Sequence, residues 1–527
     1  MQKKIVSGLF SGMLTSLLLM GINTEAVAGN KVWITLGDTA FHQLQKLAPQ
    51  TIAKDSQIVV ANPGFQGLTG SMIQEKVHLV EVDEQQLTGL SAAIHQELKR
   101  CGGFMFHPNE SAGRVALSTP ASLNAIAASL APSYVIDNQT VVTPMLSQMQ
   151  ASNIGQTIID MSGYANRYYT TTNGVNASNW LKQKWVQMTS ARSDITVEQF
   201  THASWSQKSV ILTIKGTDNA AEVIVLGAHL DSINTKGTTE TTKAPGADDD
   251  ASGIASLTEV IRVLVANGYK PRRTIKIMGY SAEEVGLRGS QEIAKSFKAA
   301  NTNVIGMMQL DMTNYKGSDK DIYLYTDYTN SAQNQFVANL ISTYQPSLSI
   351  GYDKCGYGCS DHASWYAQGY ATSMPFETAF TQDNPYIHTE NDTYANSGGQ
   401  ANHSLKFARL ALSFAVELGS DGAATPGPVD KVETFTGSLT KGQKASYGPF
   451  KVGAGGSFAA ALSGTGDADL YVRKTSAPTT TTYDCKSDGS TSTESCSINL
   501  TANGDAYVLL NGYSAATYTL KVTYRPQ

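Results

Sequence analysis

The sequence predicts a mixed α/β domain, with a mostly parallel sheet covered by helices, followed by a small all-β sandwich domain. Between about Gln148 and Gly419, β-branched runs alternate with segments that repeat apolar residues at helical spacing, which is typical of a parallel, helix-covered sheet. Beyond a Gly/Pro-rich stretch, residues 431–527 hold short alternating runs separated by turn residues. At 527 residues the chain exceeds what one core supports, about 250 to 300 residues, so two or three folded units are expected.

The N-terminus has the pattern of a signal peptide. Lys3 and Lys4 precede an apolar run over residues 5–20, and Ala26-Val27-Ala28 fits a small-x-small cleavage site. A membrane anchor is the alternative, but it needs about 20 apolar residues, and this run is shorter and interrupted by serine and glycine. We therefore predict that residues 1–28 are a cleaved signal peptide and that the protein is secreted and extracellular. No other stretch is long and apolar enough to span a bilayer, so the mature form is not expected to cross one.

Residues 29–143 contain two helical patches, at 39–46 and 86–99, and no candidate site. In an exported protein such a segment favours a propeptide, which would make the chain a zymogen with a processing protease as a partner. An accessory domain retained in the mature protein is the alternative.

Residues 144–419 carry the alternating α/β pattern and are the predicted catalytic domain. A helix over 254–267 is indicated by apolar residues at helical spacing, namely Ile254, Leu257, Ile261 and Leu264. The other expected elements are strands at 210–214, 223–227, 274–279 and 304–310 and helices at 291–298 and 405–418.

Residues 420–430 are small, rich in Gly and Pro and without periodicity, so they form a linker by composition. The segment that follows, 431–527, alternates apolar and polar residues in short runs at 470–472, 506–510 and 518–524. These runs predict a separate antiparallel sandwich.

The charge pattern limits the class of partner. A net charge of -5 with 16% charged residues gives neither a basic field nor an acidic tail. No nucleic-acid partner is therefore expected.

Five cysteines are present, and export permits disulfides. Cys355 and Cys359 flank a short Gly-Tyr-Gly turn, and Cys485 and Cys496 bracket a Ser/Thr/Asp-rich loop, so these are the two plausible pairs, with Cys101 left over. Zinc ligation by the Cys-x3-Cys pair is the alternative. It is less favoured, because an oxidising compartment promotes the bridge.

Five residues able to ligate metal follow one another through the α/β segment: His229, Asp249, Glu284, Asp311 and His388. Most stand where an apolar strand or a glycine-rich turn ends, which is the edge where open α/β sheets place their ligands. Each alone has an ordinary explanation, such as a buried histidine, a helix cap or a loop-end carboxylate. The five together predict a two-zinc hydrolytic site.

Two further patterns support this interpretation. Glu283 and Glu284 follow the strand at 274–279 and repel each other, so a cation or a raised pKa would help to retain them there. One of them can then bind metal while the other acts as general base. The three consecutive aspartates at 248–250 also exceed what capping the next helix needs.

Six motifs stand out in this segment: GAHLDS (227–232), GADDDASGIA (246–255), AEEVGLRGS (282–290), QLDMTNY (309–315), CGYGCSDHASW (355–365) and IHTENDT (387–393). They resemble those of the secreted bacterial leucine aminopeptidases with two co-catalytic zincs. The resemblance covers about 148–419 and implies the zinc exopeptidase fold. All five ligand positions and the base recur in order.

The resemblance implies two Zn²⁺ ions per chain and assigns the site residues. The implied roles are a bridging carboxylate, Asp249; ligands of one zinc, His229 and Asp311; ligands of the other, Glu284 and His388; and the general base, Glu283. It further implies Asp231 as partner of His229, a Cys355–Cys359 disulfide, and Ser360 near the bound water. The implied reaction removes the N-terminal residue, preferentially leucine or another large apolar residue, from peptides with a free N-terminus, by a zinc-activated water.

Six apolar side chains beside the motifs are candidates for the substrate pocket: Met312, Tyr357, Met374, Phe376, Phe380 and Ile387. Core packing is the alternative for about half of them. In the C-terminal segment, GDADLYV (466–472) and YTLKV (518–522) resemble the bacterial pre-peptidase C-terminal domain.

Two other functions fit parts of the pattern. A carboxypeptidase or deacylase on the same fold would need a cation for the substrate carboxylate, and Arg288 is a candidate that is equally well explained as a structural ion pair. A catalytically inactive binding or receptor domain is the second alternative. The complete ligand set and Glu283 argue against it.

Overall fold

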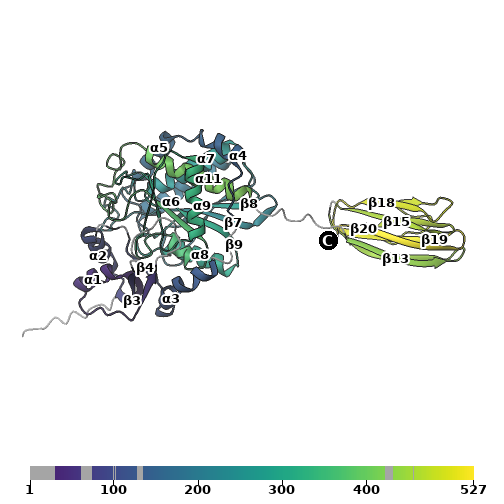
Figure 1. Ribbon diagram of the computed structural model, residues 1–527, viewed down its shortest axis with the longest axis horizontal. Coiled ribbons are helices and arrows are strands. Elements are labelled where there is room, and N and C mark those ends of the chain that lie inside the picture. Colours follow the sequence, from purple (N-terminus) through teal and green to yellow (C-terminus); the bar gives the residue numbers. More distant parts are fainter. Residues whose placement is uncertain are drawn as a thin grey trace, which may run out of the picture. The chain divides into compact units, whose positions relative to one another are not determined.

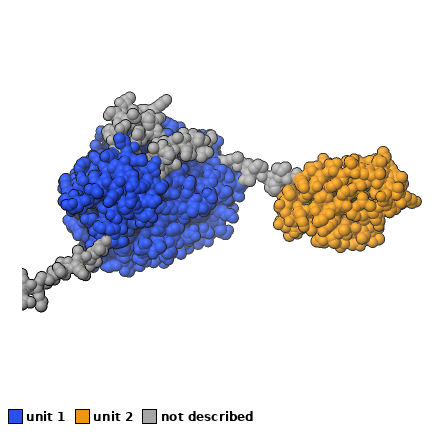
Figure 2. Space-filling view, turned by 90° about the horizontal axis from the view of Figure 1, so that it is seen from below, with its two compact units in different colours: residues 1–422 blue, residues 423–527 orange. Residues whose placement is uncertain are grey.

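The computed structural model describes residues 30–60, 74–98, 100, 102–127, 134–421, 431–454 and 456–527 (Figure 1). The chain forms two compact units, residues 1–422 and 423–527 (Figure 2). The predicted signal peptide, Cys101 and nearly all of the predicted linker lie outside the described residues. None of the helices described combines enough length with enough hydropathy to cross a membrane.

The N-terminal part of the first unit is a folded domain with its own sheet. Four antiparallel strands lie in the order β2-β3-β1-β4: β1 (Lys31–Gly37), β2 (Asp55–Val60), β3 (Gln74–Asp83) and β4 (Phe104–His107). The helices here are α1 (Asp38–Leu47), α2 (Gln86–Ala93), the π-helical turn η1 (Ile94–Leu98) and α3 (Glu110–Ala127). Alternate residues of β1, namely Val32, Ile34 and Leu36, are buried in its core. The two predicted helical patches are confirmed, but the strands between them were not predicted.

An eight-stranded sheet organises the rest of the first unit, in the order β11-β10-β12-β9-β7-β8-β6-β5. The strands are β5 (Ile195–Phe200), β6 (Ser209–Ile214), β7 (Asn219–His229), β8 (Arg273–Tyr280), β9 (Asn303–Gln309), β10 (Ile322–Tyr325), β11 (Ile350–Asp353) and β12 (Thr372–Phe376). The central strands β12, β9, β7 and β8 are mutually parallel. At one edge of the sheet, β6 pairs antiparallel with β8, and β5 pairs antiparallel with β6. The predicted fold class is confirmed.

Helices cover this sheet: α4 (Gln139–Leu146), α5 (Ala151–Ser162), α6 (Thr172–Thr189), α7 (Ala251–Ala266), α8 (Arg288–Ala299), α9 (Ser331–Tyr344), α10 (His362–Tyr366) and α11 (Asn402–Ser420). The four apolar residues that predicted α7 are all fully buried in the main core, and α11 packs beside α7. The elements between 311 and 402 were not predicted.

The position of α4 bears on where the catalytic domain begins. Val142, Met145 and Leu146 are buried in the main core, and Glu417 of α11 accepts the backbone N–H of Asn138 at 3.2 Å. The predicted boundary at 143/144 falls inside this helix. The Tyr134 ring stacks on Phe336 and packs against the main core. Cleavage of the chain before Tyr134 would therefore leave this core intact.

The second unit is a sandwich of two four-stranded antiparallel sheets, β13-β20-β15-β18 and β14-β19-β16-β17. The strands are β13 (Lys431–Leu439), β14 (Lys444–Val452), β15 (Ser457–Thr465), β16 (Ala468–Lys474), β17 (Cys485–Ser487), β18 (Glu494–Asn499), β19 (Gly504–Gly512) and β20 (Ala516–Tyr524). Alternate residues face one core, and a disulfide joins Cys485 to Cys496. The three predicted runs lie within β16, β19 and β20.

Candidate metal centre

The candidate ligands gather at one edge of the central sheet. His229 ends β7, Asp311 follows β9 by two residues, and Glu283 and Glu284 follow β8. Since β7, β8 and β9 are parallel neighbours, their carboxyl ends meet at this edge. Asp249 stands two residues before α7 and reaches the same place.

Asp249 lies between two pairs of side chains. Its Oδ1 is 2.9 Å from His229 Nε2, which is also 3.5 Å from Asp311 Oδ1. Its Oδ2 is 3.0 Å from His388 Nε2, which is also 2.9 Å from Glu284 Oε2. The two oxygens of one carboxylate therefore face two separate sets of one histidine and one carboxylate each, all almost fully buried.

Asp250 has a structural position. It too lies within 4.8 Å of His229 and Asp311. Its oxygens, however, accept the backbone N–H groups of His229 at 3.0 Å, Gly253 at 2.8 Å and Met312 at 3.1 Å. Asp250 thus caps α7 and fixes the loops that carry the ligands, and this leaves Asp249 as the better candidate ligand.

Asp248 and Asp392 fix the same loop from other sides. Asp248 accepts the backbone N–H of Asn314 at 3.0 Å and the side-chain amide of Asn384 at 2.9 Å. Asp392 accepts the backbone N–H groups of Asp248 and Asp249, both at 3.1 Å. The three consecutive aspartates therefore have three different environments, and only the middle one faces both histidines.

Asp231 connects the first histidine to the glutamate pair. Its carboxylate accepts the backbone N–H of Glu283 at 3.0 Å and that of Glu284 at 3.3 Å. His229 Nδ1 lies 3.2 Å from the backbone oxygen of Asp231 and 3.6 Å from its Oδ1. The residue thus holds both glutamates in place as well as contacting the imidazole.

The donor atoms of the site fit a divalent cation. Both oxygens of Glu283 and Asp311 Oδ1 are buried, yet none makes a hydrogen bond with the described residues. Buried polar atoms without hydrogen bonds are costly, and a metal ion would satisfy these lone pairs. Histidine and carboxylate donors suit zinc and similar divalent ions.

The electrostatics of the site agree with this fit. Burial raises the pKa of Glu284 to about 7, assisted by the neighbouring Asp249 carboxylate. Burial also raises the pKa of Glu283 well above its usual value. For His388, burial opposes the charged form, but the Glu284 and Asp249 carboxylates raise its pKa well above the usual value. A concentration of buried negative charge of this kind is stabilised by cations.

A pocket opens beside Asp311 and has an empty volume of about 260 Å³, part of it open to solvent. Its lining residues are Asp311, Tyr325, Cys355, Tyr357, Cys359, Met374, Phe376, Phe380 and Asp383.

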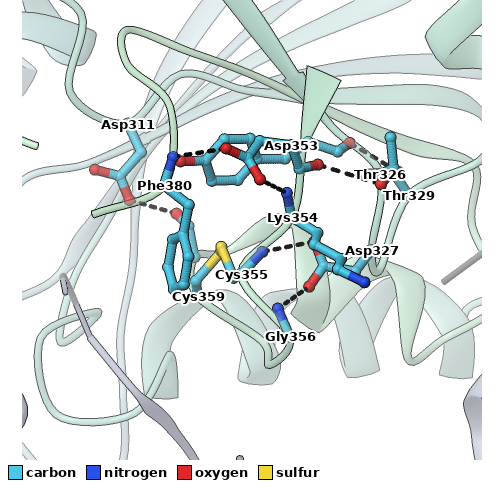
Figure 3. Close-up of a disulfide and its surroundings, with 12 residues drawn as sticks. Asp311, Thr326, Asp327, Thr329, Asp353, Lys354, Cys355, Gly356, Cys359 and Phe380 are labelled. Carbon is cyan, nitrogen blue, oxygen red and sulfur yellow. Dashed lines mark hydrogen bonds between the residues drawn. A yellow bond between two sulfur atoms is a disulfide. The ribbon is translucent and has the colours of Figure 1, made fainter. Parts of the chain in front are cut away.

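The disulfide between Cys355 and Cys359 forms one wall of the pocket (Figure 3). Asp327 accepts the backbone N–H of Cys355 at 3.1 Å and that of Gly356 at 2.6 Å, which holds the loop (Figure 3). Ser360, directly after the loop, donates to Asp311 Oδ2 at 2.5 Å. The loop is therefore tied to the candidate metal site.

The six predicted pocket residues share one hydrophobic cluster. The pocket is lined by four of them, Tyr357, Met374, Phe376 and Phe380, whereas Met312 and Ile387 belong to the cluster but not to the lining. Sequence reasoning missed Asp383, since a carboxylate in the polar stretch 381–385 resembles an ordinary loop residue.

The N-terminal domain contacts the rim of the site. Phe106 of β4 donates its backbone N–H to the carbonyl of Gly286 at 3.0 Å. Gly286 has a φ of +100°, and a Cβ there would meet Phe106 N at 2.8 Å, so the close approach requires glycine. Arg288 pairs with Glu84 at 2.7 Å and lies 4.0 Å above the Phe106 ring.

Two side chains of the N-terminal domain reach further in. The His95 ring lies 5.1 Å from the His388 ring, between centroids. Arg100 places its guanidinium 4.7 Å from the ring centroid of Phe380 and 5.8 Å from that of Tyr357. Both the candidate metal site and the pocket are thus contacted by this domain.

Comparisons with known proteins agree with the geometry. Residues 209–414 match the model of peptidase family M28, and residues 448–512 match that of the bacterial pre-peptidase C-terminal domain. The chain is 34% identical over 297 residues to "Leucine aminopeptidase 1" of Coccidioides posadasii. This alignment covers 54% of this chain and 75% of that protein. It is 32% identical over 295 residues to a probable aminopeptidase of Saccharomyces cerevisiae, covering 54% of this chain and 77% of that protein.

Among solved structures, the LapA aminopeptidase of Legionella pneumophila is similar with a TM-score of 0.60 and 28% identity, covering 75% of this chain and 100% of that chain. LapB of the same organism has a TM-score of 0.58 and 28% identity, covering 74% of this chain and 100% of that chain. The identity and coverage of the relatives show that this chain belongs to peptidase family M28 and carries a bacterial pre-peptidase C-terminal domain.

Proposed function

We propose that this protein is a metallo-aminopeptidase with two zinc ions, which removes an N-terminal residue, leucine or another large apolar residue, from peptides. The observation that carries the proposal is the position of Asp249, whose two oxygens face His229 with Asp311 and His388 with Glu284. These five residues would hold the metals. Bound zinc would supply Lewis-acid polarisation and acidify water.

Glu283 is the proposed general base. It is 1% exposed, its oxygens make no hydrogen bond with the described residues, and its backbone is held by Asp231. Glu283 takes the proton of the attacking water as oxygen bonds to the carbonyl carbon. It then gives this proton to the amine nitrogen as the C–N bond breaks.

The apolar walls of the pocket support a preference for a large apolar first residue. Met374, Phe376 and Tyr357 are nearly fully buried and present carbon surface beside Asp311. Burying a leucine side chain against such walls contributes about 1.5 to 3 kcal/mol.

The direct test of the mechanism is Glu283→Gln, with the exposed Glu198→Gln as matched control. The Gln variant should keep both zinc ions, counted by mass spectrometry, while kcat falls by about 10²- to 10⁴-fold. The control should retain both zinc and turnover. Loss of zinc in Glu283→Gln, or turnover near that of the control, would contradict the assigned role.

We also propose that the N-terminal domain is a propeptide that keeps the enzyme latent until a processing protease removes it. Its contacts with the site rim, through Phe106, Glu84 and His95, support this role. The position of α4 in the main core favours a processing point before Tyr134 rather than at 143. Mass spectrometry of the mature protein would locate the cut, and a mature chain that begins near residue 29 would refute the proposal.

Export through residues 1–28 is part of the same proposal. The two disulfides are compatible with an oxidising compartment. Deleting residues 1–28 should leave the protein inside the producing cell, as measured by fractionation, whereas unchanged secretion would exclude a signal peptide there.

A further inference from the structure

The apolar pocket contains a carboxylate that the proposed mechanism does not use. Asp383 lines it together with Asp311 and the aromatic walls. Thr378 donates its hydroxyl to Asp383 Oδ1 at 3.1 Å, which orients the group. Burial raises the pKa of Asp383 to about 7, and the carboxylates of Asp249, Asp311 and Asp353 also raise it.

A pocket for leucine alone gains nothing from such a group. An ionised carboxylate among apolar walls pays a desolvation cost that a cationic partner offsets. The candidate zinc ligands, Asp311 among them, would have the metals as their partners. Asp383 is therefore available to a cation that enters the pocket.

A guanidinium group from the same chain already lies on two of the pocket walls. Arg100 places its Cζ over the rings of Phe380 and Tyr357, and its Nη1 donates to Thr39 Oγ1 at 2.7 Å. Its Nε is buried without a hydrogen-bond partner among the described residues. The aromatic walls thus accept a cation face-on.

We infer that this pocket receives a long cationic side chain, that of lysine or arginine, as the N-terminal residue of the substrate. The inference rests on the proposed aminopeptidase function and extends its substrate class. The aliphatic stem packs against Met374, Phe376 and Phe380 as leucine would, and the charged head reaches Asp383. In the uncut chain, Arg100 covers the same walls that the substrate side chain would use.

The test measures kcat/KM for aminoacyl amides whose side chains differ mainly in charge. Arginine is compared with citrulline and lysine with norleucine. The enzyme is the full chain with an engineered protease site within residues 128–133. The full chain is allowed to fold first and is then cut at this site. The variants are Asp383→Asn, Thr378→Val and, as control, the exposed Asp319→Asn.

For the unaltered enzyme we expect a higher kcat/KM for arginine than for citrulline and for lysine than for norleucine. Asp383→Asn should reduce both ratios by about 10- to 100-fold, as the loss of a charge-assisted hydrogen bond does. Thr378→Val should reduce them less, and Asp319→Asn should leave them unchanged. The preference for free arginine over free citrulline as inhibitors should change across the variants in the same way as the kcat/KM ratios. Inhibition constants report binding without turnover.

Two results would overturn the inference. One is an unaltered enzyme that cleaves citrulline and norleucine amides better than the cationic pair. The other is an Asp383→Asn variant in which all four substrates slow equally, since that indicates a structural role. Failure of the proposed function looks different, because none of the four amides would then be cleaved by any variant.

Discussion

The imidazole ring of His95 lies 5.1 Å from the ring of His388. His95 belongs to the N-terminal domain, and His388 is a candidate metal ligand in the catalytic domain. Together with Arg100 over Phe380, this contact brings the N-terminal domain against both parts of the proposed active site.

The contact predicts that the uncut chain is latent. Protein cut within 128–133 and freed of the N-terminal domain should hydrolyse leucine p-nitroanilide at least about tenfold faster than the uncut chain, because the side chains over the pocket leave with the domain. His95→Ala with Arg100→Ala in the uncut chain should give an intermediate rate. Equal rates before and after cutting would show that the contacts do not restrict access.

Asp249 and Asp250 should respond differently to substitution. Asp249→Ala should release both zinc ions, since each site loses the oxygen that faces it, and the metal-free protein should unfold at no lower urea concentration. Asp250→Ala should lower the stability of the metal-free protein by about 1 to 3 kcal/mol, because three backbone N–H groups lose their acceptor. The check is zinc content and urea unfolding in a chelator. Retention of one zinc by Asp249→Ala would contradict the shared-carboxylate arrangement.

Asp231 should affect turnover through the glutamates. Asp231→Asn replaces one acceptor oxygen by a donor that opposes the N–H of Glu283 or Glu284. Such partners of ligand residues typically change metal affinity or activity by about 10- to 100-fold. We expect kcat to fall by that factor with KM nearly constant. A change in KM alone would mean that Asp231 acts on substrate binding instead.

His107 should make the N-terminal domain sensitive to acid. It is 2% exposed, hydrogen-bonded to Thr35 at 2.9 Å, and burial, aided by the charge of Lys295, lowers its pKa to about 3. In the unfolded chain this histidine has a pKa of about 6.5, so it binds a proton at a pH where His107 in the folded domain stays neutral. The contribution of His107 to stability is therefore complete above pH 6.5 and is lost as the pH falls. The expected loss at pH 5 is about 2 kcal/mol.

Hydrogen exchange of the β1 and β4 amides in the full chain would measure this loss between pH 7 and 5, after correction for the intrinsic exchange rate. His107→Gln cannot titrate and should flatten the dependence. An equally steep dependence in that variant would assign the effect to other groups.

Sequence patterns were sufficient for the central strands and the candidate ligands. β7, β8 and β9 are buried on both faces, so their sequences are continuous apolar runs, and polar residues at their ends are conspicuous. The same reasoning fails for β10, β11 and β12, because strands of four or five residues are too short to show a period.

The separate environments of Asp248, Asp249 and Asp250 could not be read from the sequence. They are determined by contacts with residues distant in the chain, such as Met312 and Asp392. The carboxylate of Asp383 was missed for the same reason, since its place in the pocket depends on how the loop after β12 folds back.

The central claim is that the chain is a two-zinc aminopeptidase. The most direct measurement compares hydrolysis of leucine p-nitroanilide with that of its N-acetylated form by protein cut within 128–133, with zinc counted by mass spectrometry. We predict release from the free-amine substrate only, with two zinc ions per chain and loss of turnover on chelation. Cleavage of the acetylated substrate alone, or two bound zinc ions without any turnover, would contradict the claim.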